Sequence, residues 1–306
     1  MQPLLRHTLG LLFITLGGSL IACSGSSDGG DDLGADGVGV GGSPANSGGA
    51  SSSGGSGGTV SASGGATGSG GSSTTSSVAD LLGKDDWEAM FPNHAALYSY
   101  EGFIEATKHP LFAGFAATGS DETRRRELAA FLGNIAQETT GGWPDAPGGQ
   151  WAWGLYFSEE SGCESGQCPG YCVPCDPANP PPEGCYQCAA GKSYHGRGPL
   201  QISYNFNYGR AAEALGEPIL AQPELVGTDG KVAFEAALWF WMTAKSGGTV
   251  TCHDVMVAGT GFGAAIRVIN GIECNGAHPA KIDGRIAHFE RAAAILGVTV
   301  GDNLRC

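Results

Sequence analysis

The sequence predicts a mainly α-helical domain with long ordered loops around a cleft, and three observations support this. Apolar residues recur at helical intervals over much of residues 78–306. Residues 144–198 instead carry many Gly, Pro and Cys with little periodicity, which predicts loops with at most short strands. Residues 24–77 contain 19 Gly and 16 Ser in 54 residues, with no aromatic residue and no cysteine, so they cannot form a core.

The predicted helices follow one another along the folded part. A first apolar series consists of Trp87, Met90, Phe91, Leu97, Tyr98, Phe103 and Ile104. The clearest helix follows Ser120, a good N-cap residue, and has apolar positions at i, i+3, i+4 and i+7 between Leu128 and Ile135. This helix delivers Glu138 at its C-terminal end. Helical patterning returns at residues 210–215, 232–244, 263–270 and 281–296.

The first 22 residues have the layout of a secretory signal peptide. Arg6 precedes an apolar run over residues 8–22 that is too short for a comfortable membrane span. The run leads into Cys23 through a Leu-Ile-Ala sequence that resembles the bacterial lipobox, in which the cysteine carries lipid. Ser24 is compatible with outer-membrane sorting, so we expect an exported protein, either an outer-membrane lipoprotein or extracellular. The alternative is an ordinary signal peptide with an incidental cysteine.

Residues 23–77 are predicted to be a lipidated cysteine followed by a flexible tether, with the folded domain at residues 78–306. As a Gly-rich random coil, the tether would span roughly 40 Å. The formal net charge is −14 at pH 7, so the chain lacks the excess of basic residues expected of a protein that binds nucleic acid or anionic lipid. We therefore expect no nucleic-acid partner, membrane contact only through the lipid anchor, and a neutral ligand. Simple solubility is the alternative explanation of the charge.

Carboxylates on two separate elements are the candidate catalytic groups. Glu138 lies where a helix gives way to a Gly-Gly turn, and Glu159 and Glu160 follow the aromatic, turn-rich stretch 150–154. Glycoside hydrolysis needs such a pair, one protonated to assist the leaving oxygen and one ionised to activate water. The alternative for Glu138 is a solvated glutamate at a helix end.

Several blocks of sequence resemble the family 19 glycoside hydrolases, the plant-type chitinases. Residues 136–143 are similar to the ETTGGW signature of that family, and further blocks follow in the family's order: WAWGLYF at 151–157, GKSYHGRGPLQISYNFNYG at 191–209, PELVGTDGKVAFEAALWFWMTA at 223–244, VINGIEC at 268–274 and GVTVGDNLRC at 297–306. The resemblance covers nearly all of residues 82–306. It implies a lysozyme-like, two-lobed domain with a central cleft and long disulfide-pinned loops.

The resemblance also implies roles for individual residues. Glu138 matches the general acid, Glu160 the general base, and Ser203 the serine that holds the attacking water. Matches to substrate-binding residues and to the ion-pair network around the acid are Gln201, Asn207, Asn270, Tyr186, Glu273 and Arg285. The implied activity is endo-acting hydrolysis of the β-1,4 linkages of chitin or chitooligosaccharides, with inversion, by a monomer without cofactor or metal. Inverting enzymes keep their two carboxyls roughly 6.5 to 9.5 Å apart.

Some of these assignments leave alternatives open. Glu159 could be the base in place of Glu160, although the spacing from the WAWG block favours Glu160. Two of the polar matches, Gln201 and Asn270, could instead tie down loops. The pair of Glu273 with Arg285 could serve stability alone. Three adjacent aromatic residues at 239–241 are expected in the core, since they cannot share one helix face.

The chain also departs from the plant pattern. Gln137 replaces the histidine that usually precedes the acid, which is expected to alter a nearby hydrogen bond or the pKa of the acid. Only Gly271 separates Asn270 from Ile272 where plant members often have two glycines, so the placement of Asn270 is open. The stretch 242–263 is short, and fewer outer subsites are expected.

Nine cysteines lie in residues 163–306, six of them within 163–188. In an exported protein these should form disulfides, and the odd count leaves one thiol either buried and free or paired to another molecule. The resemblance implies the pairs Cys172 with Cys188 and Cys274 with Cys306. The two Cys-x-x-Cys spacings inside 172–188 resemble a zinc ribbon, so structural zinc is the alternative.

Three other functions are carried as alternatives. A peptidoglycan hydrolase of the same superfamily would cleave a backbone with the same β-1,4 linkage. A non-catalytic chitin-binding lectin is disfavoured because Glu138 and Glu160 are both present. A zinc-stapled surface adhesin would be revealed by metal analysis.

Overall fold

The computed structural model describes residues 77–163, 168–181 and 184–306. The predicted signal peptide, Cys23 and the tether up to residue 76 lie outside these described residues. No helix in the described part of the chain is long and apolar enough to cross a membrane.

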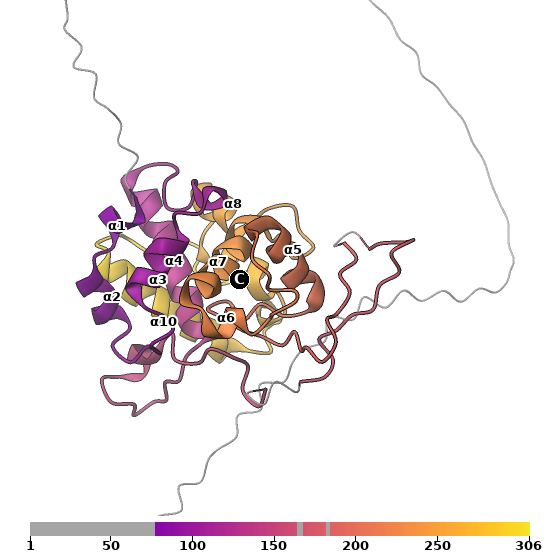
Figure 1. The fold of residues 1–306 in the computed structure, drawn as a ribbon. Helices are drawn as coiled ribbons and strands as arrows, with labels where there is room; N and C mark the ends of the chain where they lie inside the picture. The colour runs from indigo at the N-terminus through magenta and orange to yellow at the C-terminus, as the bar shows by residue number, and fades with distance from the viewer. Residues whose placement is uncertain (1–76, 164–167, 182–183) are drawn as a thin grey trace, which may run out of the picture. The chain divides into compact units, whose positions relative to one another are not determined.

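The prediction of a mainly α-helical domain is confirmed (Figure 1). Within the described ranges there are no named strands, and pairing between extended segments is limited to isolated bridges that join Arg197 to Glu159 and to Ile202. The helices are α1 (Val78–Leu81), α2 (Lys84–Met90), α3 (Tyr100–Ala106), η1 (Pro110–Phe112), α4 (Asp121–Glu138), η2 (Gln150–Trp153), α5 (Asn205–Leu215), α6 (Leu225–Thr228), α7 (Gly230–Thr243), α8 (Cys252–Val257), α9 (Phe262–Asn270), η3 (Glu273–Asn275) and α10 (Pro279–Ile295).

The central helix α4 carries Glu138 at its last position. It begins after Ser120, whose Oγ accepts a hydrogen bond from the backbone N–H of Thr123 at 3.1 Å. Two acidic residues in the first turn complement the positive end of the helix dipole. The helix ends because Thr139 leaves helical geometry and its hydroxyl turns back to donate to the carbonyl of Ile135 at 2.6 Å. The same hydroxyl oxygen accepts from the N–H of Leu155, which fixes the position of the turn after Glu138.

Helix α10 packs along α4, and glycine makes their close approach possible (Figure 1). A Cβ at Gly133 of α4 would lie 2.7 Å from the backbone N and Cα of Phe289 in α10. A Cβ at Gly284 of α10 would meet the side chain of Gln137. This approach brings Arg285 of α10 within reach of the end of α4.

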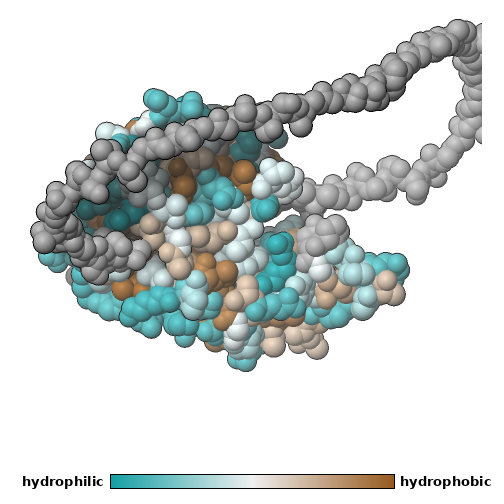
Figure 2. Space-filling model, turned by 90° about the horizontal axis from the view of Figure 1, so that it is seen from above, coloured by the Kyte–Doolittle hydropathy of each residue, from teal (hydrophilic) through white to brown (hydrophobic). Residues whose placement is uncertain are grey.

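The core is built around α4 and α7 by large aromatic side chains. Phe131 of α4 lies between Phe103 and Trp241, at centroid distances of 6.0 and 5.5 Å. Of the three aromatic residues at 239–241 that were expected in the core, Trp239 and Trp241 are 2% and 0% exposed and belong to it. The expectation was wrong for Phe240, which is only partly buried. On the molecular face drawn in Figure 2, hydrophobic residues are interspersed among hydrophilic ones.

Four disulfides lie in the described residues: Cys163–Cys168, Cys172–Cys188, Cys175–Cys185 and Cys274–Cys306. They include both pairings implied by the family resemblance. The ninth cysteine, Cys252, is buried and free, which answers the question left by the odd count. The sulfurs of the two Cys-x-x-Cys pairs are all in disulfides, so they are not available as the thiolate ligands that zinc requires.

Candidate active site

The cleft has a volume of about 190 Å³ and is formed by parts of the chain that are distant in sequence. It brings together the end of α4, residues 200–204 before α5, one residue each of α5 and α7, and the last two residues of α9. The lining residues are Glu138, Leu200, Gln201, Ile202, Ser203, Tyr204, Asn207, Phe240, Ile269 and Asn270.

Glu138 is held at the cleft by a buried guanidinium. Nη2 of Arg285 donates to Oε1 of Glu138 at 2.5 Å, and Nε of the same group donates to Oε2 of Glu273 at 2.8 Å. The third arm, Nη1, donates to Oδ1 of Asn134 at 3.1 Å. Asn270 then donates to Glu273 at 3.2 Å, so this cleft residue is tied to the same network.

The network places one cation between two carboxylates of different exposure. The Arg285 side chain is 1% exposed and that of Glu273 is 4% exposed, whereas that of Glu138 is 20% exposed. Burial by itself would lower the pKa of Arg285, but the charges and hydrogen bonds of Glu138 and Glu273 outweigh it and raise the pKa. The guanidinium therefore stays charged and fixes one oxygen of Glu138.

The segment before α5 presents Gln201 and Ser203 through a tight turn, and Asn207 follows in the first turn of α5. Gln201 and Tyr204 both adopt positive φ, at 49° and 71°, in a conformation that L residues rarely take. The Ser203 hydroxyl donates to the carbonyl of Gln201 at 3.0 Å, and the Asn207 amide donates to the carbonyl of Ser203 at 2.9 Å. The backbone strain is thus held by local hydrogen bonds, and strained backbone of this kind clusters at functional sites.

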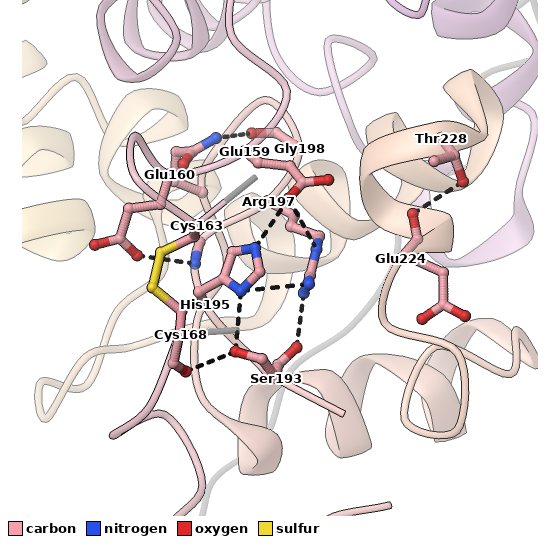
Figure 3. A network of polar contacts seen from close by, with 12 residues as sticks. Glu159, Glu160, Cys163, Cys168, Ser193, His195, Arg197, Gly198, Glu224 and Thr228 are labelled. Atoms are coloured by element: carbon pink, nitrogen blue, oxygen red, sulfur yellow. Dashed lines mark hydrogen bonds and ion pairs between the residues drawn. A yellow bond between two sulfur atoms is a disulfide. The ribbon is translucent and has the colours of Figure 1, made fainter. Parts of the chain in front are cut away.

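Glu159 and Glu160 have separate surroundings (Figure 3). Oε2 of Glu159 lies 3.0 Å from Nε2 of His195 and 3.9 Å from Nε of Arg197. Glu160 points to the other side of the segment, where its Oε1 accepts from the Tyr171 hydroxyl at 2.7 Å and its Oε2 from the N–H of Gly196 at 3.3 Å.

His195 is a neutral hydrogen-bonding bridge in this arrangement. Nδ1 of His195 lies 3.0 Å from the Ser193 hydroxyl and 3.3 Å from Nη2 of Arg197. Because a guanidinium can only donate, the contact with Arg197 makes Nδ1 an acceptor. Nε2 then carries the proton and donates to Glu159. Burial lowers the pKa of His195, and the charge of Arg197 adds to this against the hydrogen bond with Glu159. Glu159, whose side chain is 22% exposed, is therefore hydrogen-bonded to a buried histidine, and this contact fastens the segment that carries Glu160.

A sulfur-rich group lies beside the same histidine. Donor atoms of Cys163, Cys168 and His195 lie within 4.8 Å of one another, which is a spacing that could suit a metal ion. The two sulfurs are joined in a disulfide, so they do not provide thiolate ligands.

The structure brings most of the sequence-predicted site residues together. Glu138, Gln201, Ser203, Asn207 and Asn270 all line the cleft. Arg285 and Glu273 lie directly behind Glu138. Glu160 is outside the cleft lining, and the bridge between residues 197 and 202 connects its neighbourhood to the segment that carries Ser203.

Tyr186 departs from the expectation that it lines the cleft. Its ring lies against Gly209, where an added Cβ would come within 2.2 Å of the ring. Its hydroxyl donates to Oε2 of Glu213 at 2.8 Å, and it is not among the cleft-lining residues. The carbonyl of Tyr186 is held by Asn205, so the segment turns the ring toward α5.

Several site residues carried no clear signal in the sequence. Phe240 lines the cleft although its neighbours Trp239 and Trp241 are core residues, because successive helical residues point about 100° apart. Tyr204 also lines the cleft. Tyr171 contacts Glu160 from the cysteine-rich loops, a contact that only the tertiary structure reveals.

An exposed row of aromatic rings continues from the turn after Glu138. Trp143, Tyr156 and Phe157 are 46%, 42% and 47% exposed. Trp153 links them, with ring centroids 5.2 Å from Trp143 and 5.3 Å from Tyr156. A contiguous set of large exposed aromatic rings indicates a binding surface.

Comparison with known proteins gives the same family over the whole described domain. Residues 76–306 match the glycoside hydrolase family 19 model, described as Chitinase class I. Chitinase 10 of Oryza sativa subsp. japonica is 44% identical over 223 residues, which cover 68% of this chain and 72% of that protein. An endochitinase of Carica papaya is 43% identical over 223 residues, which cover 68% of this chain and 86% of that protein. The match spans 62% of rice Chitinase 9.

Solved structures agree with the sequence relatives. Chitinase C from Streptomyces griseus HUT6037 superposes with a TM-score of 0.62 at 39% identity, covering 74% of this chain and 80% of that chain. A bacterial family 19 chitinase superposes with a TM-score of 0.60 at 40% identity, covering 74% of this chain and 100% of that chain. The fold, the family match and these identities together show that the chain belongs to glycoside hydrolase family 19, the class I chitinases.

Proposed function

We propose that this chain is an endo-acting chitinase that hydrolyses the β-1,4 linkages between N-acetylglucosamine units with inversion of configuration. The observation that carries the proposal is Glu138, a half-buried carboxyl at the cleft that Arg285 holds by one oxygen. The cleft also offers amide and hydroxyl groups from Gln201, Ser203 and Asn207, which suit the polar substituents of an N-acetylated sugar.

In the proposed reaction Glu138 is the general acid and Glu160 the general base. Glu138 gives its proton to the glycosidic oxygen, and the bond from that oxygen to the anomeric carbon breaks. Glu160 takes a proton from a water molecule held with Ser203, and the water oxygen bonds to the anomeric carbon from the opposite face. Arg285 stabilises the carboxylate that Glu138 becomes.

Amide groups of the cleft would orient the substrate. Gln201, Asn207 and Asn270 each have a side-chain amide in the lining and could bond the N-acetyl groups. The aromatic row of Trp143, Trp153, Tyr156 and Phe157 would extend the grip beyond the cleft by packing against sugar rings. This combination fits a chain longer than a disaccharide and supports the endo mode of attack.

The choice of Glu160 over Glu159 as base rests on their different partners. One oxygen of Glu159 lies beside the buried side chains of His195 and the cationic Arg197. The two oxygens of Glu160 accept from neutral donors, the Tyr171 hydroxyl and the Gly196 N–H. Because a nearby cation lowers the proton affinity of a carboxylate, we assign the role of base to Glu160.

The first test is proton NMR of the anomeric products during digestion of the N-acetylglucosamine hexamer by residues 78–306. Early α-anomer product is expected, with the Glu138→Gln variant as the inactive control. Early β-anomer product would contradict inversion, and a hexamer left intact while peptidoglycan is degraded would move the function to the bacterial cell wall.

We also propose that the domain is exported as a monomer and held to the outer membrane by a lipid on Cys23. The support is the signal-like run over residues 8–22 that ends at this cysteine. Cys23→Ala should release the protein from isolated membranes, whereas Ser24→Ala should leave it attached. Continued membrane association of Cys23→Ala would overturn the anchor.

A further inference from the structure

The described part of the cysteine-rich segment, residues 168–181 and 184–188, reaches a candidate catalytic residue through one side chain. Tyr171 lies between Cys168 and Cys172, and its hydroxyl donates to Oε1 of Glu160 at 2.7 Å. This contact joins a disulfide-bonded loop to the carboxylate proposed as the general base.

Backbone contacts fix the segment near Tyr171. Asn205, which is 1% exposed, accepts from the N–H of Val173 at 2.8 Å and donates to the Val173 carbonyl at 3.0 Å. The N–H of Asn205 donates to the carbonyl of Tyr171 at 3.2 Å. The disulfide Cys172–Cys188 closes the segment directly after Tyr171. The chain at Tyr171 is therefore fastened to the start of α5, the helix that follows Ser203.

The ring of Tyr171 contacts the cleft wall. Its centroid lies 5.3 Å from that of Tyr204, a lining residue, in a tilted arrangement. Tyr204 in turn stacks on Phe206 at 5.4 Å. Tyr171 thus lies between the cleft wall and Glu160, and packing against Tyr204 restricts where its hydroxyl can point.

The other polar groups near Glu160 have partners of their own. His195 is bonded to Glu159, and Arg197 donates to the carbonyl of Ser193 at 2.9 Å. The Gly196 N–H meets the second oxygen of Glu160 at 3.3 Å. Burial raises the pKa of Tyr171, and its hydrogen bond to Glu160 raises it further, so the phenol remains a donor at any working pH.

We propose that Tyr171 is a positioning residue for Glu160 and that the cysteine-rich segment belongs to the active site because it holds Tyr171 in place. This inference rests on the proposed role of Glu160 as base. The hydroxyl orients the carboxylate toward the water and favours its ionised form, since a donated hydrogen bond stabilises the charged state.

The test compares Tyr171→Phe with the wild type over a range of pH on the N-acetylglucosamine hexamer. The phenyl ring keeps the packing against Tyr204 and removes only the donor. We expect kcat to fall on the order of tenfold with little change in KM, because a misplaced general base affects the chemical step. Since the charged carboxylate loses a hydrogen bond, the acidic limb of the kcat profile should move to higher pH by about one unit.

Two controls make the result specific. Tyr100→Phe removes a hydroxyl that donates to the Leu82 carbonyl at 2.9 Å, and neither residue is a hydrogen-bond partner of Glu160. This variant should leave the pH profile unchanged. Asn205→Ala loosens the fastening of the segment while keeping the Tyr171 hydroxyl, and should shift the acidic limb in the same direction by a smaller amount.

The outcomes separate the two proposals. Loss of activity in Glu160→Gln together with a shifted profile in Tyr171→Phe supports both. Loss in Glu160→Gln with an unshifted Tyr171→Phe profile overturns the positioning role and leaves the proposed base standing. Full activity of Glu160→Gln overturns the base assignment and the inference that rests on it.

Discussion

Arg285 approaches Glu138 at 2.5 Å from a position where its own side chain is only 1% exposed. The same guanidinium contacts Glu273 and Asn134, so three elements, α4, η3 and α10, meet at one buried cation. Removing the charge would leave a buried carboxylate unpaired, which costs more free energy than the intact pair contributes. The site and the stability of the domain are therefore coupled at this residue.

Arg285→Lys should lower both activity and stability, because the single ammonium nitrogen of lysine cannot reach the three side chains that the separate nitrogens of the planar guanidinium contact. We expect kcat/KM to fall at least about tenfold, and the free energy of unfolding to fall by roughly 2 to 3 kcal/mol. Urea denaturation and hexamer hydrolysis measure the two effects. Arg305→Lys is the matched control, since its pair with Asp283 is more than half exposed and should be worth less than about 1 kcal/mol.

Glu138→Gln should abolish hydrolysis and leave binding of the oligosaccharide nearly unchanged. The amide keeps the shape of the side chain but has no acid proton to give. A loss of kcat of roughly 10²- to 10⁴-fold is expected from the removal of general acid catalysis. Calorimetric titration with the hexamer measures the binding. Substantial turnover by this variant would show that another group is the acid.

Glu159→Gln and Glu160→Gln should differ sharply. The amide oxygen of a glutamine at 159 can still accept from His195, so that variant should keep most of its activity. At 160 the change removes the proposed base, and kcat should fall by about 100-fold or more. Initial rates on the hexamer compare the pair, and equal losses would contradict the distinction between the two glutamates.

Acid should weaken the fold partly through His288. Burial, helped by the charges of Arg291 and Arg285, lowers the pKa of His288 to about 3. The unfolded chain takes up this proton near pH 6.5, so stability is lost as pH falls from about 6.5 toward 3, at up to about 1.4 kcal/mol per pH unit. Urea denaturation at several pH values should show a flatter dependence for His288→Phe than for the wild type.

His253 contributes in the opposite sense to this pH dependence. Its hydrogen bond with Glu127 raises its pKa despite partial burial, so its stabilising contribution is present below about pH 6.5 and is lost as pH rises. Because His253 is unchanged in His288→Phe, the difference between variant and wild type isolates His288. An identical slope for the two proteins would contradict the assignment.

Gly133→Ala should destabilise the domain more than Gly284→Ala. The new methyl at 133 would meet the backbone of Phe289, which cannot move without shifting α10, and about 1 to 3 kcal/mol of stability should be lost. At 284 the methyl would meet the end of the Gln137 side chain, which can rotate away. Thermal unfolding of the two variants tests the ranking.

Sequence reasoning succeeded where the signals were local. The helix that follows Ser120 and ends at Glu138 is found as α4, because the cap and the apolar spacing act within the segment. Helix α8 was not predicted: it begins with a capping box between Thr251, its N-cap, and Asp254, its third residue, and its six residues are too few to show periodicity.

The contacts around the site depended on tertiary structure. The bond from Tyr171 to Glu160 spans a disulfide-bonded loop, and no periodicity or spacing describes it. Phe240 reaches the cleft because of the orientation of α7 about its own axis, which packing against the other helices sets. Tyr186 matches the family in sequence position, but that position did not determine the direction of its ring. Asn205 donates to the backbone carbonyl of Tyr186, and this contact turns the ring toward α5.

The disulfides of the cysteine-rich segment are nested, with Cys175–Cys185 enclosed by Cys172–Cys188. The inner disulfide fixes the distance between Cys175 and Cys185, so the chain between these two cysteines can change without moving the part that carries Tyr171. Changes of length or composition between the inner cysteines should therefore cost little, since closing a longer loop adds only about 0.6 kcal/mol per doubling. Residues added between the inner cysteines should therefore leave the contact of Tyr171 with Glu160 unchanged, so new binding residues can be introduced there.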